Sequence, residues 1–118
     1  MIYTEQEKQK LDRVLEVFAE YLKQRDHCDI AWSNKIGYLI LDFSSDIDSV
    51  TPIGTAEDLC REMLVYIMID VISMTKLEHT FKELNAIEQA EILRRWQPYF
   101  EQLPEYEYLR EKLTSEWP

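Results

Sequence analysis

One segment of this chain is apolar around most of its helical circumference, and the need to bury it constrains the fold more than any other feature. Between residues 55 and 74, apolar side chains occupy most of the helical circumference, and one narrow polar stripe contains Asp58, Glu62, Tyr66, Asp70 and Ser73. A helix that is hydrophobic on nearly all sides must be surrounded by other elements. Thr55 is suited to cap its first turn, which also contains two acidic residues. We therefore predict a central helix from about residue 55 to about residue 74.

Other helices have sequence signals at their first residues. Thr4 and Asn85 are each followed three residues later by Glu, the spacing of a capping box, in which each side chain accepts the other residue's backbone N–H. Apolar residues at helical intervals follow both boxes. The sequence predicts helices over about 5–26 and 86–97, the second ended by a proline, and a last helix over about 104–114 that starts at a proline.

The length and composition favour one mainly helical domain. The chain has 118 residues, the usual size of a single domain, and only two glycines, which long sheets and tight turns use freely. We predict the class mainly α (α+β), with residues 1–118 forming a single domain. In this fold, four to five helices surround the central apolar helix, and a small β-hairpin lies near residues 28–43.

The predicted hairpin has arms over residues 28–33 and 36–43. Asn34 tolerates positive φ and can begin a two-residue turn between the arms. The second arm is apolar on both faces, so we expect both faces to be covered. A hairpin alone is marginal in water, so helices must back it or another chain must extend it. A buried helix is the competing interpretation, but the Tyr, Ile and Phe content favours strands. We expect a loop over residues 44–54.

The charge and the cysteines indicate the setting in which the protein acts. There are 13 Lys and Arg against 23 Asp and Glu, and the excess negative charge is spread along the chain. Phosphate backbones would repel this field, so we expect no nucleic-acid partner. The longest apolar run is too short to cross a bilayer and no signal segment follows Met1, so we expect no membrane partner. Isolated Cys28 and Cys60 are expected to be buried reduced thiols, which is typical of a cytoplasmic protein.

Three acidic residues of the apolar helix are the candidates for metal chemistry. Asp58, Glu62 and Asp70 share one helix face, and helix-borne carboxylates can hold Mg²⁺ for reactions of phosphates. The alternative is that they form the solvated edge of a mostly buried helix. Asp70 is flanked closely by apolar residues, and burial of its carboxylate would point to a function. The His and Cys residues lack the close spacing of a zinc site, and we expect no cofactor.

Aromatic side chains are the candidates for contact with another protein. The last 23 residues hold six of the fourteen aromatic residues. Aromatic residues are enriched at the energetic centres of interfaces. The alternative is that they cover the core while their polar tips face water. As interface candidates we select Trp32 and Tyr38 of the hairpin, and Tyr106 and Trp117 near the C-terminus.

These observations favour a small, acidic, non-catalytic protein–protein interaction or regulatory module. Its expected partner is a second copy, giving a homodimer, or a basic protein. The alternative function is a metal-dependent enzyme that acts on a phosphate-bearing small molecule through Asp58, Glu62 and Asp70. A mimic of nucleic acid that blocks a DNA-binding protein is a third possibility, and it requires carboxylates at phosphate-like spacing.

Overall fold

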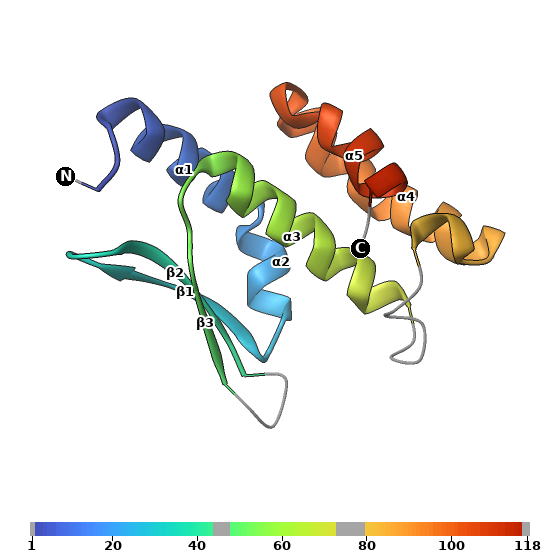
Figure 1. Ribbon diagram of the computed structural model, residues 1–118, viewed down its shortest axis with the longest axis horizontal. Coiled ribbons are helices and arrows are strands. Elements are labelled where there is room, and N and C mark those ends of the chain that lie inside the picture. Colours follow the sequence, from blue (N-terminus) through green and yellow to red (C-terminus); the bar gives the residue numbers. More distant parts are fainter. Residues whose placement is uncertain (1, 44–47, 73–79, 117–118) are drawn as a thin grey trace. The chain divides into compact units, whose positions relative to one another are not determined.

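The computed structural model describes residues 2–43, 48–72 and 80–116. Within these residues there are five α-helices and a three-stranded antiparallel sheet (Figure 1), which confirms the mainly α (α+β) class. The helices are α1 (Glu5–Val17), α2 (Ala19–Gln24), α3 (Ala56–Val71), α4 (Ala86–Gln102) and α5 (Tyr108–Glu116). The strands are β1 (Cys28–Ser33), β2 (Gly37–Asp42) and β3 (Ser49–Pro52). Short 3₁₀ turns cover Phe81–Glu83 and Pro104–Tyr106.

The chain divides into two compact units, Met1–Leu59 and Cys60–Pro118. The first unit contains α1, α2 and the sheet, the second contains α4 and α5, and α3 contributes residues to both. The single domain expected from the length stays a prediction. Among the described helices, none combines the length and the apolar character that a membrane crossing requires.

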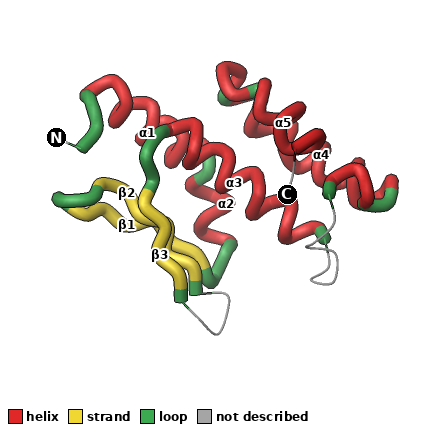
Figure 2. Tube along the Cα trace, viewed as in Figure 1, coloured by secondary structure: helices red, strands yellow, loops and turns green. Residues whose placement is uncertain are grey.

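The sheet contains the predicted hairpin and one strand that was not predicted. The strand order is β1-β2-β3, and both pairings are antiparallel. Figure 2 shows the three strands together in one sheet. The loop expected over residues 44–54 is wrong for residues 49–52, which pair with β2 so that Leu39 lies opposite Pro52 and Leu41 opposite Val50. A proline is tolerated because β3 is an edge strand, where one side of the backbone needs no ladder partner.

The hairpin turn is one residue longer than predicted. Ser33 and Gly37 are cross-strand partners, so residues 34–36 form the turn. The Ser33 hydroxyl accepts the N–H groups of the last two turn residues at 3.2 and 3.3 Å. Gly37 has a φ of 93°, which L-residues rarely adopt, and a Cβ atom there would lie 2.5 Å from the hydroxyl oxygen of Tyr3. Both the backbone angle and the space available therefore require glycine.

The N-terminal helical segment is broken where one helix was expected over residues 5–26. Phe18 separates α1 from α2 with a φ of −93° and a ψ of 6°. The Phe18 N–H still donates to the Val14 carbonyl and the Phe18 carbonyl still accepts the Leu22 N–H, each at 3.0 Å. Helical hydrogen bonding thus continues across the break, and the fully buried Phe18 side chain anchors it in the core.

Glu7 links α1 to the start of α3. As predicted, the Thr4 hydroxyl caps α1 by accepting the Glu7 N–H at 3.0 Å. The Glu7 carboxylate does not complete a capping box; it accepts the N–H of Ala56, the first residue of α3, at 2.6 Å. The N-terminus of a helix carries unpaired N–H groups and partial positive charge, so a carboxylate there stabilises the helix start.

The second unit is built around buried apolar side chains of α3 and α4, which confirms that α3 is buried along most of its length. Trp96 is fully buried, and its indole N–H donates to the Leu64 carbonyl at 2.9 Å. Its ring contacts Phe81 and Phe100, with centroid distances of 6.4 and 6.2 Å. Cys60 is a buried thiol outside any disulfide, as Cys28 is in the first unit, which confirms the prediction for both thiols.

α4 begins with the predicted capping box at Asn85 but does not end before its proline. The helix continues through Pro98 to Gln102, so the predicted end at residue 97 is wrong. A proline removes one backbone donor and strains the preceding turn. Trp96 and Phe100 lie on either side of it and are both buried, and the packing of this face outweighs the cost.

Candidate interaction surface

The two faces of the sheet have different surroundings. Side chains of a strand alternate between faces, and the register places Cys28, Tyr38 and Ile40 on the same one, here called the inner face. Cys28 and Ile40 are 7% and 1% exposed. The Tyr38 hydroxyl is hydrogen-bonded to Lys8 and Asp12, so α1 covers this face.

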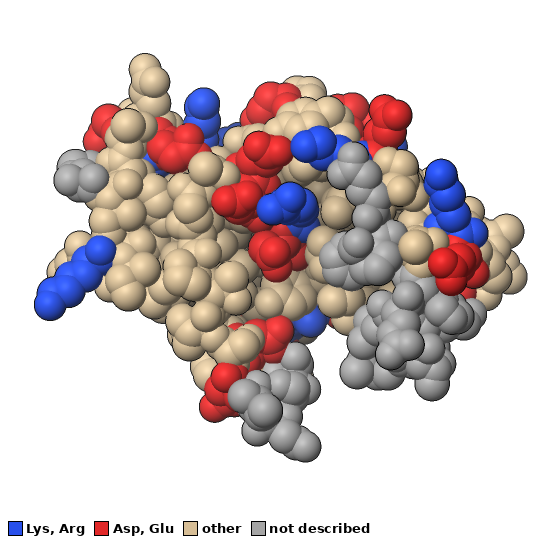
Figure 3. Space-filling model, in the orientation of Figure 1, with Lys and Arg blue, Asp and Glu red and all other residues tan. Residues whose placement is uncertain are grey.

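The opposite face carries apolar side chains that the described residues leave uncovered. We call it the outer face. Its apolar side chains are Ala31, Leu39, Leu41, Val50 and Pro52, together with Phe43 directly after β2, and the register also places Asp29 on it, opposite Leu41. None of these side chains is buried, and Val50 and Phe43 are 59% and 48% exposed. In Figure 3, a broad area without charged side chains lies over the part of the molecule that contains the sheet. Exposed apolar surface of this kind makes the face a candidate interaction surface.

The N-terminal segment is fastened to the inner side of the sheet through one hydroxyl group. The Tyr38 carbonyl accepts the Ile53 N–H at 3.0 Å, which is half of a normal antiparallel pair. The other half is interrupted by Tyr3, whose hydroxyl accepts the Tyr38 N–H at 3.0 Å and donates to the Ile53 carbonyl at 2.5 Å. The hydroxyl therefore replaces a direct backbone bond between β2 and the residue after β3.

Three aromatic rings gather near this junction and form what we call the aromatic cluster: Tyr3, Trp32 and Tyr38. The Trp32 and Tyr38 rings meet edge to face, with centroids 4.8 Å apart. Tyr3 lies 6.2 Å from Trp32 and 6.4 Å from Tyr38. The Lys8 ammonium lies 5.0 and 5.2 Å from the centroids of the Trp32 and Tyr38 rings, which is within the range of a cation–π interaction.

Lys8, Asp12 and Tyr38 form a hydrogen-bonded group at the edge of the aromatic cluster. The Tyr38 hydroxyl donates to Asp12 Oδ1 at 2.6 Å, and Lys8 Nζ lies 3.1 Å from Asp12 Oδ2. The hydrogen bond from Tyr38 is the largest cause that lowers the pKa of Asp12. Burial, followed by the bond to Asp12, raises the pKa of Tyr38. The group is thus a neutral phenol that bridges the ion pair of Lys8 and Asp12.

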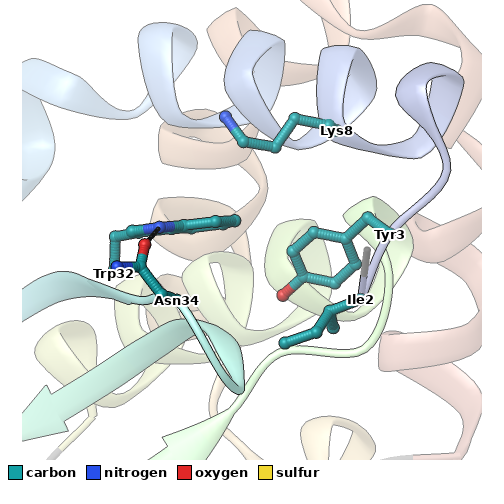
Figure 4. A pocket seen from close by; sticks show the side chains of 5 residues that line it. All are labelled: Ile2, Tyr3, Lys8, Trp32 and Asn34. Carbon is teal, nitrogen blue, oxygen red and sulfur yellow. Dashed lines mark hydrogen bonds between the residues drawn. The ribbon is translucent and has the colours of Figure 1, made fainter.

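A small pocket opens beside this group. It is lined by Ile2, Tyr3, Lys8, Trp32 and Asn34 and has a volume of about 110 Å³ (Figure 4). The Asn34 side-chain oxygen accepts the Trp32 indole N–H at 3.0 Å and holds that ring in place. A dry cavity of about 150 Å³ accommodates benzene, so this pocket suits a smaller apolar group such as one aliphatic side chain.

The four predicted interface residues differ in how far the structure exposes them. Trp32 is 47% exposed at the pocket, and Tyr38 is half-buried beneath α1. Tyr106 is 8% exposed in the turn that follows α4, so little of its side chain is available for contact with a partner. Trp117 lies outside the described residues.

The acidic residues of the alternative function are not brought together as a metal centre. Across the described parts of the chain, no group of three or more His, Cys, Asp or Glu is placed to hold a metal ion. Asp58 and Glu62 are half-buried and Asp70 is exposed, so the burial that would have made Asp70 a functional candidate does not occur.

The outer face is a candidate interaction surface that the selection of single residues in the sequence missed. The sequence contained a signal for it, since the second hairpin arm is apolar on both faces. The expectation that both faces are covered is wrong for the described residues, because a single layer of helices covers only one face of a sheet. No protein-family model, curated protein or solved structure matches the chain. A functional assignment therefore rests on the geometry of these surfaces.

Proposed function

We propose that this protein is a non-catalytic interaction module that binds another protein through the outer face of its sheet. The observation that supports the proposal is the difference between the two faces. The inner face holds buried Ile40 and Cys28 beneath α1, whereas the outer face holds half-buried or exposed Leu39, Leu41 and Val50.

A partner would remove this apolar surface from water. Burial of apolar area is favourable by about 25 cal/mol per Å², and it is the dominant favourable contribution to most protein associations. The wide dispersal of negative charge keeps the chain soluble and repels phosphate backbones, so the partner is a protein and not a nucleic acid. The two buried thiols, neither of which is in a disulfide, fit a protein that acts in the cytoplasm.

Site-specific photocrosslinking in the cells that produce the protein tests the proposal. A photoreactive phenylalanine analogue replaces Val50 on the outer face, or Ile87, which is 82% exposed in the second unit and serves as the matched control. We expect a discrete adduct from position 50 and none from position 87. Leu41→Lys in the same chain should remove the adduct, with circular dichroism showing that the variant is folded. Equal crosslinking from both positions would contradict the proposal.

A further inference from the structure

We infer that the outer face binds a basic amphipathic helix of a partner protein, an inference that rests on the proposed function and names its occupant. The alternatives are an added β-strand and a second copy of this chain. The free edges, the size of the face and its charge each distinguish between these occupants.

The exposed edge of β1 is protected against an added strand. Ile30 and Ile40 form a non-hydrogen-bonded pair of the antiparallel ladder. The backbone N–H of Ile30 therefore points away from β2 and toward the free edge of β1. The Asp29 carboxylate accepts that N–H at 2.8 Å. An added strand would have to displace this bond and approach an exposed negative charge, a common protection of edge strands.

The edge of β3 is also unsuited to strand addition. β3 has four residues and ends at Pro52, which has no N–H to donate. Main-chain pairing is therefore disfavoured on both sides of the sheet, and the apolar side chains of the face remain as the binding surface.

The size of the outer face suits one helix better than a second copy. β1 and β2 are each about 20 Å long and β3 is about 13 Å long, so with a strand spacing of about 4.8 Å the sheet presents a face of roughly 250 Å². A stable dimer needs about 800 Å² from each partner. A helix about 10 Å in diameter and about 20 Å long covers the face with one apolar stripe.

The charge around the face specifies a basic partner. Residues 27–54, which form the sheet and its connections, contain four Asp and one Lys. Asp29 is exposed and lies on the outer face itself, opposite Leu41, and the exposed Asp48 directly precedes β3. Two copies would bring like charges together, whereas Lys or Arg residues flanking an apolar helix stripe would meet opposite charge. The occupant is therefore an amphipathic helix with basic flanks.

A synthetic peptide of Leu and Lys tests the inference. About 14 residues span the face as a helix, with Leu at helical spacing and Lys elsewhere. The matched probes are the same pattern with Glu in place of Lys, and a peptide of the same composition in which Leu and Lys alternate. Fluorescence anisotropy against the full chain should show that the helical Leu–Lys peptide binds at least about tenfold more tightly than either matched probe.

Two variants of the full chain locate the binding. Val50→Lys should weaken the helical Leu–Lys peptide at least about tenfold, because it places a positive charge in the apolar face. Ile87→Lys adds the same charge in the second unit and should leave affinity unchanged. Equal weakening by both variants would indicate general attraction to an acidic protein and would overturn the inference.

Sedimentation of the same variants separates failure of the inference from failure of the proposed function. If the peptide does not bind but the chain is a dimer that Val50→Lys makes monomeric, the helical occupant is wrong while the outer face remains an interaction surface. If Val50→Lys changes neither peptide binding nor oligomeric state, and position 50 gives no crosslink, both the inference and the proposed function are wrong.

Discussion

Replacing Tyr3 by Phe removes one oxygen atom from the junction between β2 and the residue that follows β3. The Tyr3 side chain is 6% exposed, so water does not replace the hydroxyl freely. The loss leaves the Tyr38 N–H and the Ile53 carbonyl without the partners that they have at 3.0 and 2.5 Å. The ring itself, with its contacts to Trp32 and Tyr38, is retained.

The expected loss of stability follows from these two groups. A buried backbone group left without a hydrogen-bond partner costs about 1–3 kcal/mol. Ile53 is 3% exposed and its carbonyl should show the full cost, whereas Tyr38 is half-buried and its N–H should show less. We expect Tyr3→Phe to lower the free energy of unfolding by about 2–4 kcal/mol.

Urea denaturation followed by circular dichroism measures the change, and amide hydrogen exchange locates it. The Tyr38 amide should exchange faster in Tyr3→Phe than in the wild type, while amides of the second unit should not change. Tyr108→Phe is the matched control. Tyr108 is 45% exposed, and loss of its hydroxyl should lower the free energy of unfolding by less than about 0.5 kcal/mol. A loss for Tyr3→Phe no larger than that of the control would show that the strands close into a direct pair, and would refute the reasoning.

Three further predictions follow from contacts of the first unit. Gly37→Ala should lower the free energy of unfolding by about 2 kcal/mol or more, because φ is 93° and the new Cβ would lie 2.5 Å from the Tyr3 hydroxyl. In urea denaturation, the loss for the double variant Gly37→Ala/Tyr3→Phe should be smaller than the sum of the two single losses. A loss equal to that sum would show that the two sites are independent. Glu7→Ala should lower the free energy of unfolding by about 1 kcal/mol, because it removes the acceptor at the start of α3. Glu7→Gln keeps an oxygen and should lower it less. Equal decreases in the unfolding temperature for the two variants would exclude this capping role. The pKa of Tyr38 is raised in the folded state, so the folded state holds the phenol proton more tightly than the unfolded state does. The resulting contribution to the free energy of unfolding is complete below pH 10, the ordinary pKa, and is lost as the pH rises through the folded-state pKa. The stability difference between wild type and Tyr38→Phe, measured by urea denaturation from pH 8 to pH 11, should therefore be constant at first and shrink above about pH 10, and a difference that grows there would have the wrong sign.

Several parts of the fold were predictable because their causes lie within a few residues of sequence. Thr4 and Asn85 cap their helices through N–H groups three residues away. The two hairpin arms follow each other in the chain and pair around a short turn. The apolar side chains around most of α3 predicted that this helix is buried. Local hydrogen-bonding geometry and side-chain periodicity are sufficient to specify such features.

Errors at particular elements arose where packing overrode a local preference. A proline favours the end of a helix, yet α4 continues through Pro98 because Trp96 and Phe100 are buried on either side. Residues 49–52 have little strand signal of their own, and they form β3 only because β2 offers a free edge beside them.

The sequence by itself determined that the second hairpin arm is apolar on both faces, but only the tertiary structure decided which face α1 covers and which stays open. The same is true of the junction at Tyr3, whose hydroxyl joins groups 35 and 50 residues away along the chain. Contacts of that length depend on where the whole backbone lies, since a hydroxyl can complete a ladder only after the strands and the N-terminal segment are already side by side. The helices and the hairpin follow from local rules, whereas the outer face and its availability to a partner follow from the packing of the helices on the other side of the sheet.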